Sequence, residues 1–299
     1  MNIAILGSTG MIGSATTLFL SGMKHHVIEV NRQGISITGD NEFRRFDVMR
    51  DSVKELLESF PADTVIVNLI GLIRHKIEED SEASLSEAKR VNTDFPIELV
   101  RQAQDFGIRV IQIATDCVYS GQEGSYSEGS KMDPIDIYGE SKANGEILSE
   151  NLLTLRVSII GREVKNHVEL MDWVFAHPRN TRVTGYTNHY WNGVSSLHFA
   201  KIVDGILSSN TNLNGTFHIV PRDSVSKFEL IKLIADFSGR KDLEILQTAA
   251  EKRIDRRLSS INLENNSEFW KWAGYQVIPS IRMMLDEYFA WIRQNEQGE

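Results

Sequence analysis

Short apolar runs rich in β-branched residues alternate with longer segments of helical spacing through the first half of the chain. The runs lie at 2–6, 26–30, 64–70, 108–114 and 153–160. The segments of helical spacing lie between them, at 11–23, 51–59 and 81–105. Continuous apolar strands separated by helices are typical of a parallel sheet covered on both faces. Weaker runs at 43–48 and 215–220 would complete a seven-stranded sheet.

This alternation breaks down after residue 160. The segment 162–195 is rich in His, Asn, Trp and Gly and is predicted to be irregular, whereas 222–299 is mainly helical, with amphipathic stretches at 226–238 and 280–293. We therefore predict an α/β fold, a doubly wound parallel sheet of Rossmann type, with a smaller, mainly helical C-terminal substrate lobe. A dinucleotide-binding domain would take residues 1–160 and about 196–220, and the substrate lobe about 161–195 and 221–299.

A glycine-rich segment follows the first predicted strand and precedes the first predicted helix. Its spacing is G-x-x-G-x-x-G, and its members are Gly7, Ser8, Thr9, Gly10, Met11, Ile12 and Gly13. Backbone without side chains can approach a pyrophosphate closely, and the exposed N–H groups of a helix start attract its charge. Such a motif is weak alone, but the strand and helix around it provide the context that a dinucleotide site requires. We expect these seven residues to bind the cofactor.

The end of the second strand predicts which dinucleotide is preferred. It reads Ile28-Glu29-Val30-Asn31-Arg32, so the acidic residue that would bind the ribose hydroxyls of NAD is missing if Asn31 is the terminal position. Arg32 can then bind a 2′-phosphate, which a carboxylate would repel. This favours NADP(H). NAD(H) remains the alternative, with Glu29 as the ribose ligand and Arg32 as a solvated loop residue.

Further cofactor contacts are predicted where later strands end. Asp47 and Val48, after the third strand, are candidates for the adenine contact. The end of the fourth strand adds Leu69, Ile70 and Gly71 to the predicted cofactor-binding residues.

A Tyr-x-x-x-Lys pair supplies the candidate chemistry. On a helix, Tyr138 and Lys142 would project from one face. A phenol titrates near about 10, and a neighbouring ammonium favours the phenolate and lowers its pKa. Tyr138 can then donate a proton to a carbonyl oxygen as hydride reaches carbon. Thr115, at the end of strand 108–114, would hydrogen-bond that carbonyl and stabilise developing alkoxide charge.

Charge and composition narrow the partners. The net charge of −9 argues against nucleic acid, since a phosphate backbone needs a basic face. Cys117 is the single cysteine, which excludes an internal disulfide and suits a reducing compartment. We find neither a signal peptide nor a run near the roughly 18 apolar residues of a membrane span. A cytoplasmic protein with no membrane partner and no metal site is expected, and a homodimer is allowed.

The motifs together resemble extended short-chain dehydrogenases/reductases, above all the dTDP-4-dehydrorhamnose reductase family and related sugar-nucleotide reductases. The run Ile113–Gly121 resembles that family's S-T-D-Y-V-F-D-G signature, and Tyr138–Glu146 resembles its Y-G-x-x-K-x-x-G-E. Leu155–Gly161 resembles the strand that follows, and Asn92 the asparagine of a preceding helix, which adds Asn92 to the cofactor site. The likeness covers roughly the first 160 residues. It implies Tyr138, Lys142 and Thr115 as catalytic residues, Lys142 also on the nicotinamide ribose, and reduction of a keto-sugar nucleotide.

Two departures leave the particular sugar open. The chain has Tyr190–Ser196 where the family has G-x-P-T, and Cys117 replaces an aromatic residue. The candidates for substrate contact are Asp116, Tyr119, Trp191, Arg256 and Arg257. The two arginines suit a diphosphate, because a guanidinium binds phosphate oxygens in pairs.

Two other functions remain open. One is an epimerase or dehydratase with tightly held NAD, for which Asp116 would be the extra acid/base. The other is a non-catalytic NADP-binding regulatory subunit, against which the intact Tyr138 and Lys142 pair argues.

Overall fold

The computed structural model describes residues 1–163 and 169–296, and the chain packs as two compact units. The first unit comprises Met1–Ser120, Ser130–Arg156 and Thr211–Phe217; the second comprises Gly121–Gly129, Val157–Asn210 and His218–Glu299. Residues 121–129 and 196–210 thus pack with the second unit, which differs from the predicted lobes. Packing does not assign a ligand, so the division into cofactor and substrate lobes stays a prediction. Residues 164–168 of the predicted substrate lobe lie outside the described chain.

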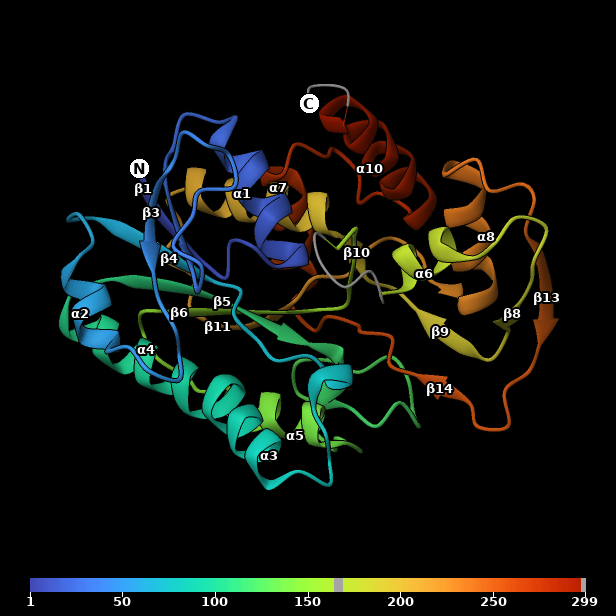
Figure 1. The fold of residues 1–299 in the computed structure, drawn as a ribbon, viewed down its shortest axis with the longest axis horizontal. Helices are drawn as coiled ribbons and strands as arrows, with labels where there is room; N and C mark the ends of the chain where they lie inside the picture. The colour runs from blue at the N-terminus through green and yellow to red at the C-terminus, as the bar shows by residue number, and fades with distance from the viewer. Residues whose placement is uncertain (164–168, 297–299) are drawn as a thin grey trace. The chain divides into compact units, whose positions relative to one another are not determined.

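A seven-stranded sheet forms the centre of the first unit (Figure 1). Its strands are β1 (Asn2–Leu6), β2 (His26–Asn31), β3 (Glu42–Arg45), β4 (Thr64–Asn68), β5 (Arg109–Thr115), β6 (Leu152–Val157) and β11 (Gly215–His218). They lie in the order β11-β6-β5-β4-β1-β2-β3, and β1 pairs in parallel with both β2 and β4. This confirms the predicted doubly wound sheet. The apolar run 153–160 is divided between two strands: β6 ends at Val157, and Ile159–Ile160 form a separate short strand, β7.

The helices of the first unit follow the predicted segments with one interruption. They are α1 (Met11–Ser21), α2 (Val53–Glu58), α3 (Glu82–Lys89), α4 (Phe95–Asp105) and α5 (Ile137–Asn144). The single helix predicted over 81–105 is divided by a π-helical segment, Arg90–Asp94. Such single wide turns within helices are frequent at functional sites.

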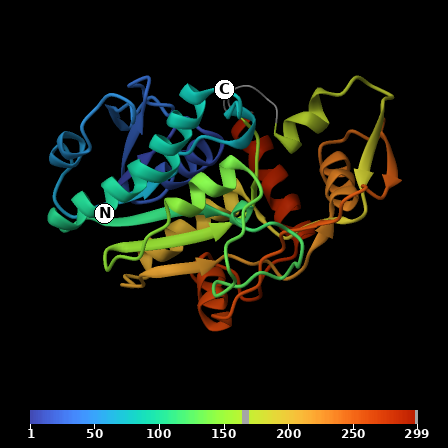
Figure 2. The same ribbon diagram turned by 90° about the horizontal axis from the view of Figure 1, so that it is seen from below.

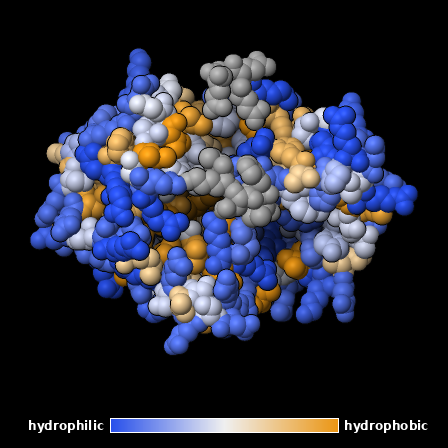
Figure 3. All heavy atoms as spheres, in the orientation of Figure 1, coloured by the Kyte–Doolittle hydropathy of each residue, from blue (hydrophilic) through white to orange (hydrophobic). Residues whose placement is uncertain are grey.

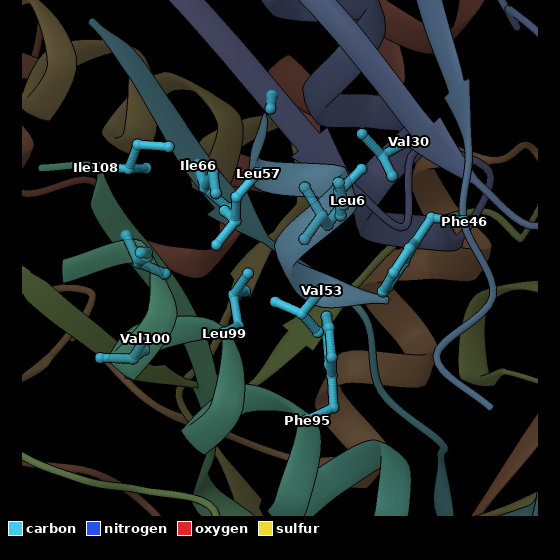
Figure 4. Close-up of a cluster of buried hydrophobic side chains, with 14 of the residues drawn as sticks. Leu6, Val30, Phe46, Val53, Leu57, Ile66, Phe95, Leu99, Val100 and Ile108 are labelled. Carbon is cyan, nitrogen blue, oxygen red and sulfur yellow. The ribbon is translucent and has the colours of Figure 1, made fainter. Parts of the chain in front are cut away.

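An apolar core joins the sheet to α2 and α4. Leu6 and Val30 project from the strands toward Leu57 of α2 and Phe95 and Leu99 of α4, as Figure 4 shows. All five side chains are buried. Burial of an apolar side chain contributes about 1.5–3 kcal/mol to the free energy of folding, so this core stabilises the packing of the two helices on the sheet.

The second unit contains more strand than its sequence predicts. Its helices are α6 (Leu170–Ala176), α7 (Ser196–Ser208), α8 (Lys227–Phe237), α9 (Leu263–Trp272) and α10 (Ile281–Glu296). Its short strands include β8 (Arg182–Tyr186), β9 (His189–Trp191), β10 (Val194–Ser195), β12 (Val225–Ser226), β13 (Glu244–Thr248) and β14 (Ile254–Asp255). The prediction of an irregular segment over 162–195 is therefore wrong in its described part. β8 pairs with β13, about sixty residues away, and local periodicity does not reveal such a partner (Figure 2).

Polar side chains predominate on the face drawn in Figure 3, with apolar residues scattered among them. Among the described helices, we find none that combines the length and the apolar character needed to cross a bilayer.

Candidate cofactor and active site

The glycine-rich loop is a close backbone turn between β1 and α1. Gly7 has a φ of +85°, a conformation that other residues rarely adopt, and its N–H donates to the carbonyl of Val30 at 2.8 Å. A Cβ on Gly13 would lie 2.0 Å from the carbonyl oxygen of Gly7, so only glycine fits where α1 crosses the loop. Gly10 precedes α1 and caps it with no side-chain hydrogen bond, and the first turn holds no acidic residue. This cradle fits a pyrophosphate, because bare backbone and a helix N-terminus face the same anion.

The end of β4 lies against this loop. A Cβ built on Gly7 would lie 3.2 Å from backbone atoms of both Leu69 and Ile70. The sheet order reverses between β1 and β4, and ligands of such sheets bind outside the strand ends at this point. The structure thus brings the glycine loop together with the predicted Leu69–Gly71 segment.

The second strand ends in two buried polar residues and an exposed arginine. Asn31 is 3% exposed, and its amide nitrogen donates to the Ser8 hydroxyl at 2.9 Å. Arg32 follows on the surface. The carboxylate of Glu29, which has no exposed surface, instead accepts hydrogen bonds from the residues that follow β2. These contacts argue against Glu29 as the ribose ligand.

Asp47 and Val48 form part of a turn after β3. An Asp47 carboxylate oxygen accepts the N–H of Met49 at 3.0 Å, and the N–H of Asp47 donates to Asp51 at 2.7 Å. Val48 is buried in the apolar core, and its carbonyl accepts the Arg90 guanidinium at 3.1 Å. These contacts give both residues a structural role, and an adenine contact stays a prediction.

Helix α5 presents the candidate proton donor. Asp136 caps its N-terminus by accepting the N–H of Gly139 at 2.8 Å, and Tyr138 lies in the first turn, partly buried. A Cβ on Gly139 would lie 2.2 Å from the carbonyl oxygen of Cys117. Glycine therefore lets α5 pack directly against the turn that follows Thr115. Tyr138 and Thr115 are brought to adjoining elements, as the sequence predicts.

Lys142 lies one turn after Tyr138 and is buried. Its ammonium donates to the carbonyl of Ile113 in β5 at 3.4 Å. Burial lowers the pKa of Lys142, and the negative charge of Glu146 opposes this shift. A Cβ on Gly71 would lie 3.8 Å from the Lys142 Nζ atom, so the ammonium lies beside the end of β4. The ammonium of Lys142 thus lies between the helix that bears it, α5, and two neighbours: strand β5 and the predicted cofactor-binding residue Gly71.

Thr115 ends β5 and caps the 3₁₀ turn Asp116–Val118. Its hydroxyl accepts the N–H of Cys117 at 3.1 Å and donates to the Asp116 carboxylate at 3.2 Å. Asp116 is partly buried. Its hydrogen bond with Thr115 places it next to the candidate carbonyl ligand. This hydroxyl carries one proton, which Asp116 accepts here, so donation to a bound carbonyl requires that proton to turn away from Asp116.

Asn92 lies in the π-helical segment and is buried. Its side-chain oxygen accepts the N–H of Leu72, and its amide nitrogen donates to the Leu72 carbonyl, both at 2.9 Å. The same nitrogen donates to the Ser141 hydroxyl at 3.0 Å. Asn92 therefore joins the loop after β4 to α5, and we find it organising the site where the sequence predicts a cofactor contact. Ser141 was not among the predicted residues, although its place beside Lys142 is a signal for it.

Tyr119 belongs to a buried network. It has no exposed surface, and its hydroxyl accepts the Arg156 guanidinium at 2.7 Å. Arg156 also pairs with Glu146 at 2.6 Å, and both side chains are less than a tenth exposed. This network argues against the predicted substrate contact of Tyr119. The pair of Glu146, which ends the Tyr-x-x-x-Lys segment, with Arg156 is not predicted from the sequence.

The remaining substrate candidates lie in the second unit. Trp191 is 5% exposed, and its indole N–H donates to the Ser158 hydroxyl at 3.0 Å, which favours packing over ligand contact. Arg257 forms a double hydrogen bond with Asp255, at 2.7 and 2.6 Å, and lies 4.7 Å from the ring centroid of Tyr190. Arg256 is partly buried beside them. Asp255, whose charge orients Arg257, was missed because no local pattern marks a buried carboxylate.

Comparisons with known proteins show which family and which solved structures the chain resembles. A probable low-salt glycan biosynthesis reductase of Haloferax volcanii is 24% identical over 262 residues, which are 84% of this chain and 85% of that protein. The dTDP-4-dehydrorhamnose reductase of Aggregatibacter actinomycetemcomitans is 24% identical over 78% of each chain. A dTDP-4-dehydrorhamnose reductase structure from Bacillus anthracis, in complex with NADP, shares the fold with a TM-score of 0.74, 18% identity and coverage of 97% and 99%. The model of the RmlD substrate binding domain family matches residues 1–289, and the chain belongs to this family.

Proposed function

We propose that this chain is an NADP(H)-dependent reductase of a keto group on a nucleotide-activated deoxy-sugar. One observation carries the proposal: α5, which bears Tyr138 and Lys142, packs on the turn after Thr115, and Lys142 donates into β5. A proton donor, a buried cation and a hydroxyl at one strand end together can protonate a carbonyl oxygen and stabilise its developing charge. The names of the two reductase relatives support the same reaction class.

The dinucleotide would lie on the glycine loop. Gly7, Gly10 and Gly13 would receive its pyrophosphate, and Lys142 its nicotinamide ribose. Arg32 is placed after β2 and carries a charge that suits a 2′-phosphate, so NADP(H) is preferred and NAD(H) is the alternative. When bound, this cofactor supplies the hydride that reaches the carbonyl carbon.

The chain's own residues would manage the carbonyl oxygen. Tyr138 donates its phenolic proton to that oxygen, and the ammonium of Lys142 stabilises the phenolate that remains. The Thr115 hydroxyl turns its single proton from Asp116 to the carbonyl oxygen and so stabilises the negative charge as it develops. Ketone, hydride and proton together give the secondary alcohol, and solvent returns the proton to Tyr138.

Substrate recognition is proposed for the second unit. Arg256 and Arg257 would hold the diphosphate of the nucleotide sugar. In the first unit, Asp116 is the candidate sugar contact, because it lies next to Thr115. Support comes from the fixed orientation of Arg257 by Asp255, which leaves a planar guanidinium with little rotational freedom to lose on binding. The single cysteine, Cys117, supports the accompanying proposal of a reducing, cytoplasmic location.

The test is a turnover screen of the purified protein with NADPH against nucleotide-linked 4-keto-6-deoxy sugars. Turnover is measured by the loss of NADPH absorbance, and the product is identified by its mass. We expect oxidation of NADPH with one ketone, and oxidation slower by about 10²–10⁴-fold with the variant Tyr138→Phe. Binding of NADPH without turnover of any ketone would overturn the reductase and favour the regulatory subunit. Retention of NAD through purification, with interconversion of sugars and no net oxidation, would favour the epimerase or dehydratase.

A further inference from the structure

Glu29 is a charged side chain with no exposed surface at the end of β2. One of its oxygens accepts hydrogen bonds from the hydroxyls of Ser36 at 2.8 Å and Thr38 at 3.2 Å, and from the amide of Asn41 at 3.2 Å. The other oxygen accepts the N–H of Ile37 at 2.8 Å. A buried carboxylate is costly unless donors surround it, and here all the donors come from one loop.

Asn31 holds the first half of the same loop. Its side-chain oxygen accepts the N–H groups of Gln33 at 3.1 Å and Ile35 at 3.4 Å. Its nitrogen donates to the carbonyl of Ile35 at 2.8 Å and to the hydroxyl of Ser8 at 2.9 Å. The loop 32–41 therefore rests on two buried side chains of β2, and one of them touches the glycine loop. Arg32, the first residue of the loop, is exposed between these anchors.

The far end of the loop is fixed as well. Asn41 donates to the hydroxyl of Ser21, at the end of α1, at 2.7 Å, while it also donates to Glu29. The carboxylate of Glu29 is thus the point where three loop side chains and one backbone N–H converge. Without that charge the donors lose their common acceptor, and the loop loses its defined shape.

We propose that Glu29 is a positioning residue for cofactor selectivity, which holds the loop 32–41 so that Arg32 meets the 2′-phosphate of NADP(H). This inference rests on the proposed cofactor. Its two parts are physically linked. Because the loop donors occupy the carboxylate, Glu29 does not bind the ribose hydroxyls, and because they converge on it, the loop that carries Arg32 is ordered before the cofactor arrives. Binding to an ordered loop avoids the entropic cost of fixing it.

The test measures dissociation constants of NADPH and NADH by calorimetry for the wild type and for Glu29→Gln. An amide lacks the charge and half of the acceptor capacity of the carboxylate. We expect NADPH affinity to fall by about tenfold or more, while NADH affinity changes less than about threefold. Glu42→Gln is the matched control, because Glu42 is a half-exposed carboxylate on the neighbouring strand β3 and should leave both constants unchanged.

Two single-donor variants keep the test decisive if Glu29→Gln fails to fold. Ser36→Ala and Thr38→Val each remove one donor from the same carboxylate, and each should lower the NADPH-to-NADH selectivity by a smaller factor. Equal losses for both cofactors, or unchanged selectivity in every folded loop variant, would overturn the inference and leave the reductase standing. A wild type without preference for NADPH also overturns it. A wild type that binds neither dinucleotide overturns the proposed function itself.

Discussion

The side-chain amide of Asn92 donates to the hydroxyl of Ser141 at 3.0 Å, and that hydroxyl donates to the carbonyl of Tyr138 at 2.9 Å. This chain of hydrogen bonds connects the π-helical segment with the helix that bears the candidate proton donor. Thr93 adds a second bond, from its hydroxyl to the carbonyl of Ser141 at 2.7 Å. The wide turn at Arg90–Asp94 thus holds the middle of α5 through two side chains, while Asp136 caps its start.

Removal of the Ser141 hydroxyl should loosen this connection. Ser141→Ala leaves a buried amide of Asn92 without one acceptor, which costs about 1–3 kcal/mol of unfolding free energy. We also expect kcat to fall, because Tyr138 and Lys142 lose a fixed orientation. Chemical denaturation and steady-state kinetics measure the two effects. Ser59→Ala, at the C-terminus of α2, is the control, and a Ser141→Ala protein with wild-type stability would contradict the network.

Two tyrosines separate chemistry from packing. Tyr138→Phe removes only a hydroxyl and should lower kcat by about 10²–10⁴-fold, with NADPH affinity and Tm nearly unchanged. Tyr119→Phe removes the partner of Arg156 and should lower Tm while kcat on the same ketone is retained. Kinetics and thermal melts of both variants decide the assignment. Full turnover by Tyr138→Phe would show that the proton comes from another group.

Lys142 is expected to lower the free energy of unfolding while it supports catalysis and NADPH binding. Burial lowers its pKa, so the folded state carries a penalty while the ammonium is charged, and this penalty fades as pH rises from the lowered pKa toward about 10.4. Lys142→Met should therefore raise the free energy of unfolding at neutral pH, with a gain that shrinks toward pH ~10. The same variant should lose both kcat and NADPH affinity. Lower stability than wild type at neutral pH would contradict this account.

The second unit should be sensitive to acid. His198 is buried, donates to or accepts from Ser195 at 2.7 Å, and lies 3.2 Å from Glu287. Burial lowers the pKa of His198, while the hydrogen bond from His198, together with Lys201 and Tyr275, lowers the pKa of Glu287. The unfolded histidine takes up its proton near pH ~6.5, so stability should fall as pH drops below that value. Loss of the Glu287 contribution follows at lower pH.

Denaturant titrations across this range test the assignment. His198→Gln should flatten the decline just below pH ~6.5, since a glutamine does not titrate. His26→Gln is the control, because His26 is about half exposed. An equal flattening by both variants would mean that His198 is not the group responsible.

Trp191 is expected to act through packing. Trp191→Ala should lower the free energy of unfolding by about 3–5 kcal/mol, as loss of a large buried side chain does. Trp191→Phe retains most of the ring and removes the hydrogen bond to Ser158. We expect Trp191→Phe to reduce stability and to leave KM for the sugar nucleotide unchanged. A raised KM with little change in stability would instead show that Trp191 contacts the sugar nucleotide.

The local hydrophobic pattern was sufficient to predict the strands and helices of the first unit. The strand before Gly7 and the helix after Gly13 follow from a single change of hydrophobic period, and the Tyr138 and Lys142 spacing follows from the helix itself. Covalent neighbours and short-range spacing set these features, so the sequence determined the doubly wound sheet, the glycine-rich turn and the spacing of the candidate catalytic pair.

Only the tertiary structure decided what distant residues do for one another. The sequence leaves Glu29 open as the alternative ribose ligand, yet the loop that returns over it supplies donors up to twelve residues away. Tyr119 and Trp191 are aromatic residues beside candidate motifs, and their burial against Arg156 and Ser158 gives them packing roles. Burial and hydrogen-bond partners depend on which segments fold back on a residue, and no local period contains that information.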